Sequence, residues 1–194
     1  MWERARRRGE AAHRKAVETA WAIHAAQTDW TGKVDAKATF AFAAESAAIA
    51  TVVALTAEDR LYSHLDEQWM WNVFAVALFG MIVAAALAAW VVVPRLRKRL
   101  VDAEAHQNYI YFGHARRWNA EDLERAMLSD DILPQLTRQI TIMAGIAWWK
   151  HRVMQASLWV AVGSGLVLVG LGLLASFIAQ SVVAVPAPTV TPTP

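Results

Sequence analysis

The chain has 194 residues, 56% of them hydrophobic, and its 19 basic and 17 acidic residues leave a formal net charge of +2. That apolar content exceeds what a soluble domain of this length needs to fill its core, which excludes an ordinary soluble globular domain. Cysteine is absent, which excludes disulfides, thiolate catalysis and cysteine-ligated metals.

Residues 1–33 are rich in arginine and in helix-forming residues, and Val17, Ala20, Trp21 and His24 recur at helical spacing. We predict a basic amphipathic helix that lies on the anionic inner leaflet. The alternative interpretation is that its arginines only satisfy the positive-inside rule. The first thirty residues have no continuous apolar run, so we do not expect a cleaved secretion signal.

The first predicted span, residues 38–57, is long enough to cross a bilayer but consists largely of alanine and contains Glu45. A charge near mid-bilayer costs ~2.5 kcal/mol or more, so this helix needs a partner, a water-filled cavity or a protonated glutamate. Two interpretations stay open. Copies of Glu45 line a polar path in an activated oligomer, or the side chain is hydrogen-bonded inside the resting bundle.

The second predicted span, residues 69–93, completes a transmembrane hairpin over residues 34–93. It contains no charged residue, and at ~1.5 Å per residue it reaches ~37 Å, more than the ~30 Å hydrocarbon layer requires. Pro94 and a basic cluster at residues 95–99 follow it and close the span.

Residues 94–155 are predicted to form a cytoplasmic helical sensor region, and its most unusual stretch is "NYIYFGHARRW", residues 108–118. Its four aromatic side chains, Tyr109, Tyr111, Phe112 and Trp118, could stack on a planar base, and its two arginines could bind a phosphate. The candidate ligand-binding residues of this stretch are Tyr109, Tyr111, Phe112, Arg116 and Arg117. The alternative is a segment that lies on lipid headgroups.

Helix signals follow the aromatic stretch. Asn119 is a suitable cap for a short helix, and Asp131 with Pro134 favours the start of another. No residue ends this second helix before the third span, so one continuous helix is expected to couple the sensor region to the bilayer. Lys150 lies on the apolar stripe of that helix, where it either extends to the headgroups or binds the ligand.

The third predicted span covers residues 156–178 and carries small residues on one face, a pattern that favours close helix association within or between chains. These helix-packing residues are Ala161, Gly165, Gly172 and Ser176. Residues 179–194 contain a proline-rich stretch and are predicted to form a disordered external tail.

The distribution of basic residues predicts the orientation. Eight lie in residues 1–37, ten in residues 95–152 and only Arg60 lies between the first two spans. Because lysine and arginine are retained in the cytoplasm, this predicts a multi-pass membrane protein with a cytoplasmic N-terminus and an external C-terminus. The predicted fold class is an all-α membrane protein with three transmembrane helices and a cytoplasmic helical region continuous with the third span.

No catalytic constellation is present in the sequence. It has no glycine-rich phosphate loop, no nucleophile motif and no histidine pair at metal-ligand spacing. We therefore expect a protein that is not an enzyme, has no catalytic residues, metal site or resident cofactor, and does not bind nucleic acid.

Four stretches, in order over about residues 30–175, resemble the transmembrane effectors of Pycsar, the bacterial antiphage systems in which a pyrimidine cyclase makes a cyclic mononucleotide. They are "DAKATFAF" from Asp35, "VVVPRLR" around Pro94, "YIYFGHA" from Tyr109 and "QITIMAGIAWWKHRVMQAS" from Gln139. Each stretch is short, but together they cover most of the chain.

The resemblance implies an antiphage effector that senses cyclic UMP or cyclic CMP, its regulatory ligand, and disrupts the inner membrane, which causes abortive infection. Its functional partner is then the pyrimidine nucleotide cyclase, acting through its product. We also expect contact with membrane lipids and a homo-oligomer. The alternative is a small oligomeric channel or membrane anchor that a protein partner controls.

Overall fold

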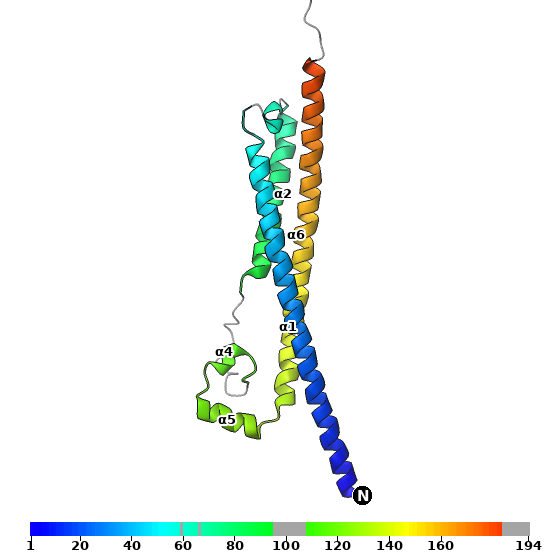
Figure 1. The fold of residues 1–194 in the computed structure, drawn as a ribbon, viewed down its shortest axis with the longest axis vertical. Coiled ribbons are helices and arrows are strands. Elements are labelled where there is room, and N and C mark those ends of the chain that lie inside the picture. Colours follow the sequence, from blue (N-terminus) through cyan, green and yellow to red (C-terminus); the bar gives the residue numbers. More distant parts are fainter. Residues whose placement is uncertain (59, 66, 95–107, 184–194) are drawn as a thin grey trace, which may run out of the picture. The chain divides into compact units, whose positions relative to one another are not determined.

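The computed structural model describes residues 1–58, 60–65, 67–94 and 108–183, and within these residues it contains helices and no strand (Figure 1). The elements in chain order are α1 (Trp2–Ala54), η1 (Leu61–His64), α2 (Gln68–Val92), α4 (Phe112–Ala115), α5 (Ala120–Ser129) and α6 (Ile132–Val183). Among the described residues three helices, α1, α2 and α6, are long and apolar enough to cross a membrane. The predicted all-α membrane class is confirmed.

The chain divides into two compact units. Residues 1–37 and 92–152 form one, here called the polar unit, and residues 38–91 and 153–194 form the other, here called the membrane unit. Helices α1 and α6 each contribute to both units. The predicted boundary between residues 33 and 34 falls inside α1, because no helix-ending signal stands there.

Helix α6 begins as the sequence indicated. The Leu133 backbone N–H donates to Asp131 Oδ1 at 3.0 Å, and Pro134 stands in the first turn, where its missing N–H has no cost. The helix then continues for 52 residues to Val183. The prediction of a helical region that continues into the third span is confirmed.

The structure differs from the prediction at the start of the C-terminal tail. Residues 179–183 are helical and complete α6, because the first proline of the tail is Pro186 and nothing before it ends the helix. The remainder of the predicted tail, residues 184–194, lies outside the described residues. The basic cluster at residues 95–99 also lies outside them.

In the polar unit, α5 has the cap that its sequence predicted. The side chain of Asn119 accepts a hydrogen bond from the Asp122 backbone N–H at 2.7 Å. Glu121 and Asp122 occupy the first turn, where the helix dipole favours negative charge. This cap orients the chain between the aromatic stretch and α6.

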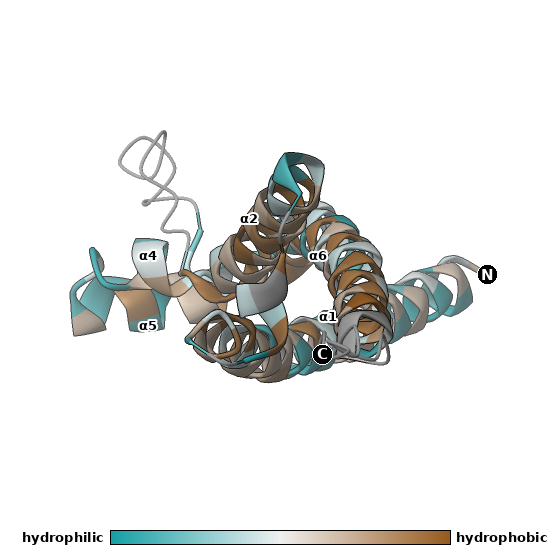
Figure 2. Ribbon diagram, turned by 90° about the horizontal axis from the view of Figure 1, so that it is seen from above, coloured by the Kyte–Doolittle hydropathy of each residue, from teal (hydrophilic) through white to brown (hydrophobic). Residues whose placement is uncertain are grey.

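In the membrane unit, the C-terminal part of α1 packs with α2 and α6 (Figures 1 and 2). Figure 2 shows α2 as predominantly hydrophobic, which fits a helix with no charged residue. Tyr62 of η1 joins the core: its ring lies 4.9 Å from that of Phe74, and its hydroxyl donates to Leu168 O at 2.9 Å. The loop between α1 and α2 is therefore tied to α6.

Two glycines permit the close packing in the membrane unit. A Cβ at Gly172 would lie 2.9 Å from Leu61 Cδ2, so a larger residue there would displace the Leu61 side chain of η1. A Cβ at Gly80 would clash with Ser164 Oγ on the facing α6 and would lie 3.3 Å from Ser164 Cβ. Small residues thus let α2 and η1 approach the α6 backbone.

Candidate functional site

The first candidate site is the aromatic segment, defined as residues 108–118, in the polar unit. Tyr109 is buried, and its backbone N–H donates to Gln135 Oε1 of α6 at 3.2 Å. Trp118 Nε1–H donates to Asn108 O at 3.2 Å, and the indole meets the Tyr109 ring edge-on at 6.1 Å. The segment is thereby folded on itself and held against the first turns of α6.

Burial raises the pKa of the Tyr109 phenol above its ordinary value, and the negative charge of Asp130 raises this pKa further. The neutral phenol is therefore the form that fits this environment. Deprotonation of Tyr109 would oppose the packing that holds the aromatic segment in place.

Tyr111 makes a second aromatic contact within the segment. Its ring meets the buried His114 ring edge-on at 5.3 Å and that of Phe112 at 4.6 Å. A Cβ at Gly113 would clash with the Tyr111 ring, so glycine is required where this ring covers the backbone. Phe112 itself is 65% exposed, whereas Tyr111 is half-buried.

The remaining predicted ligand residues lie in two different parts of the polar unit. Arg116 and Arg117 are exposed at the end of α4. Lys150 Nζ lies 2.5 Å from Asp35 Oδ1 of α1, and its side chain is only 12% exposed. Because Lys150 follows Gln135 by fifteen residues on one helix, it lies ~22 Å from it along the axis.

Asp35 is a residue that the sequence reasoning missed. It stands three residues before the predicted first span and forms the ion pair with Lys150 that joins α1 to α6. Each of the two residues stands just before a predicted span, and they carry opposite charges. This combination could have indicated the pair. The chemistry of Lys150 in this state is thus a half-buried ion pair.

A small cavity lies between the aromatic segment and α6. Its volume of ≈ 10 Å³ has room for about one water molecule, whereas pockets for small organic ligands measure ~300–1,000 Å³. Its lining consists of Asn108, Ile110, Tyr111, His114, Gln135, Arg138, Gln139 and Ile142. A nucleotide could enter only if the aromatic segment moved away from α6.

The polar lining from α6 was also missed by sequence reasoning. Gln135, Arg138 and Gln139 follow a helical spacing of three and four residues and face the aromatic segment. Amide groups can recognise the edge of a base, and a guanidinium can bind a phosphate. The signal that could have found them is that they share one helix face, next to the apolar stripe on which the prediction was based.

The second candidate site is in the membrane unit, at Glu45. The carboxyl group is 6% exposed and its Oε1 lies 3.2 Å from Ser157 Oγ of α6. Ser157 Oγ also lies 2.9 Å from the Ala84 carbonyl oxygen of α2. The three helices of the membrane unit therefore meet at one polar point, and Glu45 faces this interior.

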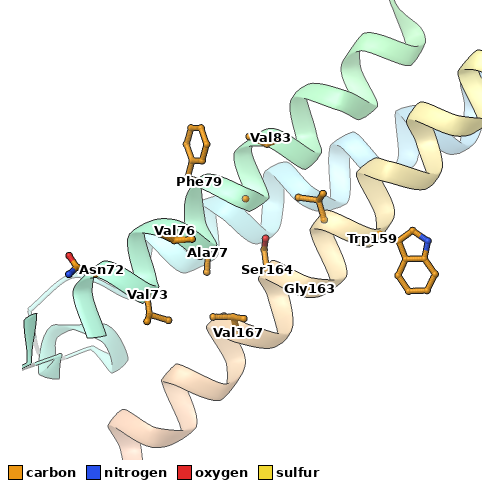
Figure 3. A pocket seen from close by; sticks show the side chains of 12 residues that line it. Asn72, Val73, Val76, Ala77, Phe79, Val83, Trp159, Gly163, Ser164 and Val167 are labelled. Atoms are coloured by element: carbon orange, nitrogen blue, oxygen red, sulfur yellow. The ribbon is translucent and has the colours of Figure 1, made fainter. Parts of the chain in front are cut away.

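Two apolar grooves run along α6 in the membrane unit. One, of ≈ 720 Å³, lies between α2 and α6, where Ala77 and Ser164 point toward the facing helix (Figure 3). The other, of ≈ 450 Å³, lies between α6 and the end of α1 with η1. Their lining is almost entirely hydrophobic, which suits acyl chains or a neighbouring transmembrane helix.

The predicted helix-packing residues of the third span face the second groove and the core. Gly165, Gly172 and Ser176 line the groove, and Ala161 packs against the core cluster around Tyr62. The contact between Gly80 and Ser164 was missed, because a lone glycine in α2 gives no spacing pattern. Within the chain, close approach is thus achieved at Gly80 and Gly172.

The chain matches the model of a protein family. The model of the family described as the Pycsar effector protein domain covers residues 19–178, which include all of the polar unit after its first 18 residues and the membrane unit as far as residue 178. Comparisons with curated proteins and with solved structures gave no match. The match joins the helices of the membrane unit and the aromatic segment in one domain. The chain therefore belongs to the Pycsar effector family, the transmembrane effectors of antiphage defence.

Proposed function

We propose that this effector is gated by a cyclic pyrimidine mononucleotide, cyclic UMP or cyclic CMP, and that it then disrupts the bacterial inner membrane and causes abortive infection. The polar unit faces the cytoplasm, where it meets the product of a pyrimidine cyclase. The protein acts as a homo-oligomer in contact with lipids and without catalysis of its own.

One contact carries the proposal. The Tyr109 backbone N–H donates to Gln135 Oε1, so the aromatic segment rests on the first turns of α6. The same helix continues without interruption to Val183 and forms the third span. A ligand that displaces the aromatic segment changes what α6 contacts at one end, and a continuous helix is a means of relaying that change.

The ligand needs an open form of the polar unit, because a cavity of ≈ 10 Å³ cannot hold a nucleotide. Opening separates Tyr111 and Asn108 from Gln135 and Gln139, which exposes an aromatic face beside several amides. A pyrimidine can stack on the ring and bond to the amides, while exposed arginines bind its phosphate. The nucleotide drives activation only through tighter binding to the open form than to the closed one.

The test is leakage of a dye from liposomes that contain the purified protein, with cyclic UMP, cyclic CMP and cyclic AMP added separately. We expect leakage with one of the pyrimidine nucleotides and none with cyclic AMP. Leakage that no nucleotide changes would instead favour a channel or anchor under the control of a protein partner.

Substitution of Arg116 and Arg117 by glutamine tests the phosphate-binding role. Each charge-assisted bond to a phosphate contributes ~1.5–3 kcal/mol, so the double variant is expected to need at least tenfold more nucleotide for the same leakage. Arg125→Gln is the matched control, because Arg125 is an exposed arginine of the same unit that pairs with Asp122. An unchanged nucleotide response in the double variant would remove both arginines from the site.

Orientation is tested by labelling, which the absence of cysteine makes simple. A single Ser129→Cys substitution places an exposed thiol at the end of α5. A membrane-impermeant maleimide should fail to label it in intact spheroplasts and should label it after lysis. Labelling before lysis would place the polar unit outside the cell and contradict the proposed function.

A further inference from the structure

The membrane unit contains a chain of polar contacts that involves all three of its helices. Glu45 of α1 contacts Ser157 of α6, and Ser157 contacts the backbone oxygen of Ala84 in α2. The exposed fractions of these residues are 6%, 0% and 0%. The contacts are hereafter called the Glu45 hydrogen-bond chain.

The number of available protons decides the direction of these hydrogen bonds. A serine hydroxyl has one proton to donate, and a backbone carbonyl can only accept. Ser157 Oγ lies 2.9 Å from Ala84 O and 3.2 Å from Glu45 Oε1, so its proton belongs with the nearer, obligate acceptor. The contact with Glu45 is then a hydrogen bond only if the carboxyl group supplies the proton.

The surroundings of Glu45 offer nothing that would stabilise a carboxylate. Glu45 Oε2 is buried, and among the described residues it has no hydrogen-bond partner. Neither α2 nor the part of α6 in the membrane unit contains a charged residue, and on α1 the nearest charged residue is Lys37, eight positions away. The loop contributes Tyr62 to the core, but its hydroxyl donates to Leu168 O. A charged group here would lack both a counter-ion and a full set of donors.

We infer that Glu45 is a proton-binding site: in the resting protein its carboxyl group is protonated and donates to Ser157 Oγ, which in turn donates to Ala84 O. Each proton in the Glu45 hydrogen-bond chain then has one acceptor. The chain ties α1, α6 and α2 together with neutral groups alone, which is what a membrane interior requires.

Loss of the proton would open the chain. The carboxyl O–H bond breaks, the proton passes to water or hydroxide that reaches the site, and a carboxylate remains opposite a hydroxyl whose only proton is already used. The charged group must then leave the interior or admit water. Hydration of Glu45 at the meeting point of three helices is a step by which the membrane unit becomes permeable.

The direct test is infrared spectroscopy of the protein in bilayers at neutral pH, without any nucleotide. Subtracting the spectrum of Glu45→Gln from that of the native protein, both labelled with carbon-13 glutamate, isolates the Glu45 carboxyl group. We expect a carbonyl stretch of a protonated acid that the variant lacks. A difference spectrum with only carboxylate bands would overturn the inference.

A functional test uses alkaline leakage from liposomes, again without nucleotide. Glutamine keeps the shape of the protonated side chain and its amide can donate to Ser157, so Glu45→Gln should lose the leak that the native protein develops as pH rises. Ser157→Ala should leak at neutral pH, while Ser164→Ala on the same helix serves as the matched control. Coincident pH profiles of the native protein and Glu45→Gln would contradict the proton-dependent opening.

Neither the infrared test nor the leakage test depends on nucleotide binding. Failure of this inference is therefore distinguishable from failure of the proposed nucleotide gating.

Discussion

The helices within each of the two units are joined by a different kind of polar contact. In the polar unit, Lys150 pairs with Asp35, and His13 Nε2 lies 3.2 Å from Asp131 Oδ1. In the membrane unit two contacts between elements are neutral hydrogen bonds with backbone carbonyls as acceptors, Tyr62 to Leu168 O and Ser157 to Ala84 O. Water can solvate partly exposed ions but not a bilayer interior, so α1 and α6 use charges in one unit and neutral groups in the other.

The helical glycines show where a neighbouring element packs closely against a helix backbone. A Cβ on Gly9, Gly32 or Gly145, all in helices of the polar unit, would meet nothing within 4 Å. In the membrane unit Gly163, Gly165 and Gly170 are equally open, but at Gly80 and Gly172 a Cβ would collide with a side chain of a neighbouring element. Without a hydrophobic force between helices in lipid, close backbone approach is a main source of packing energy. Close approach between different elements is thus found at Gly80 and Gly172 of the membrane unit, whereas Gly113 of the polar unit packs against a ring of its own segment.

The largest expected effect is that of Gly80→Val. The new side chain would collide with Ser164, so we expect it to destabilise the membrane unit by about 1–3 kcal/mol. Unfolding in mixed micelles by titration with dodecyl sulfate, followed by circular dichroism, measures the loss. Gly145→Val is the matched control, since that site is open, and it should change stability by less than about 0.5 kcal/mol. Equal losses in both variants would remove the contrast in packing.

A double-mutant cycle on Asp35→Asn and Lys150→Gln tests the charged contacts of the polar unit. For a half-buried pair we expect a coupling of about 0.5–3 kcal/mol, which decreases as salt is added. The exposed pair of Lys33 and Asp29, at 2.7 Å, is the control and should give only about 0.3–0.5 kcal/mol. The same unfolding titration measures both cycles, and identical coupling in the two pairs would show that burial of Lys150 has no energetic consequence.

The helices were predictable because their signals are local. Long uncharged runs indicate spans, and Asn119 and Asp131 are side chains whose capping role depends on neighbours within three residues. The continuity of α6 followed from the lack of any residue that ends a helix. These features can be predicted without knowing which helices contact each other.

The contacts between helices were not predictable in the same way. Asp35 and Lys150 are 115 residues apart, and Glu45 and Ser157 are 112 apart, so their pairing depends on how α1 and α6 align. For Glu45 the sequence supplied only the alternatives, a pore-lining or a hydrogen-bonded side chain. In the state that the structure describes, the carboxyl group is hydrogen-bonded and faces the interior, while a pore-lining role after activation stays a prediction.

A smaller effect is expected for Tyr62→Phe. The variant keeps the ring against Phe74 and removes only the hydrogen bond to Leu168 O, so the loss should be about 1 kcal/mol. Because this contact is neutral, the loss should be the same at low and high salt, unlike the coupling in the polar unit. A salt-dependent loss would show that the neutral and charged contacts are not separated as the two units indicate.

The smallest expected effect is the alkaline release of the aromatic segment. The pKa of Tyr109 is raised by burial and by Asp130, so the packing it supports is fully present below the unfolded value of about 10 and is lost as pH rises through the folded value. Phenolate absorbance measures the titration, and the fluorescence that is lost in Trp118→Phe, one of ten tryptophans, reports the release of its contact with the Tyr109 ring. Tyr109→Phe keeps the ring but cannot ionise, so the fluorescence change should disappear. If the fluorescence change persisted in Tyr109→Phe, another titrating group would control the release of the aromatic segment. The neutral phenol would then result from the packing and would not be needed for it.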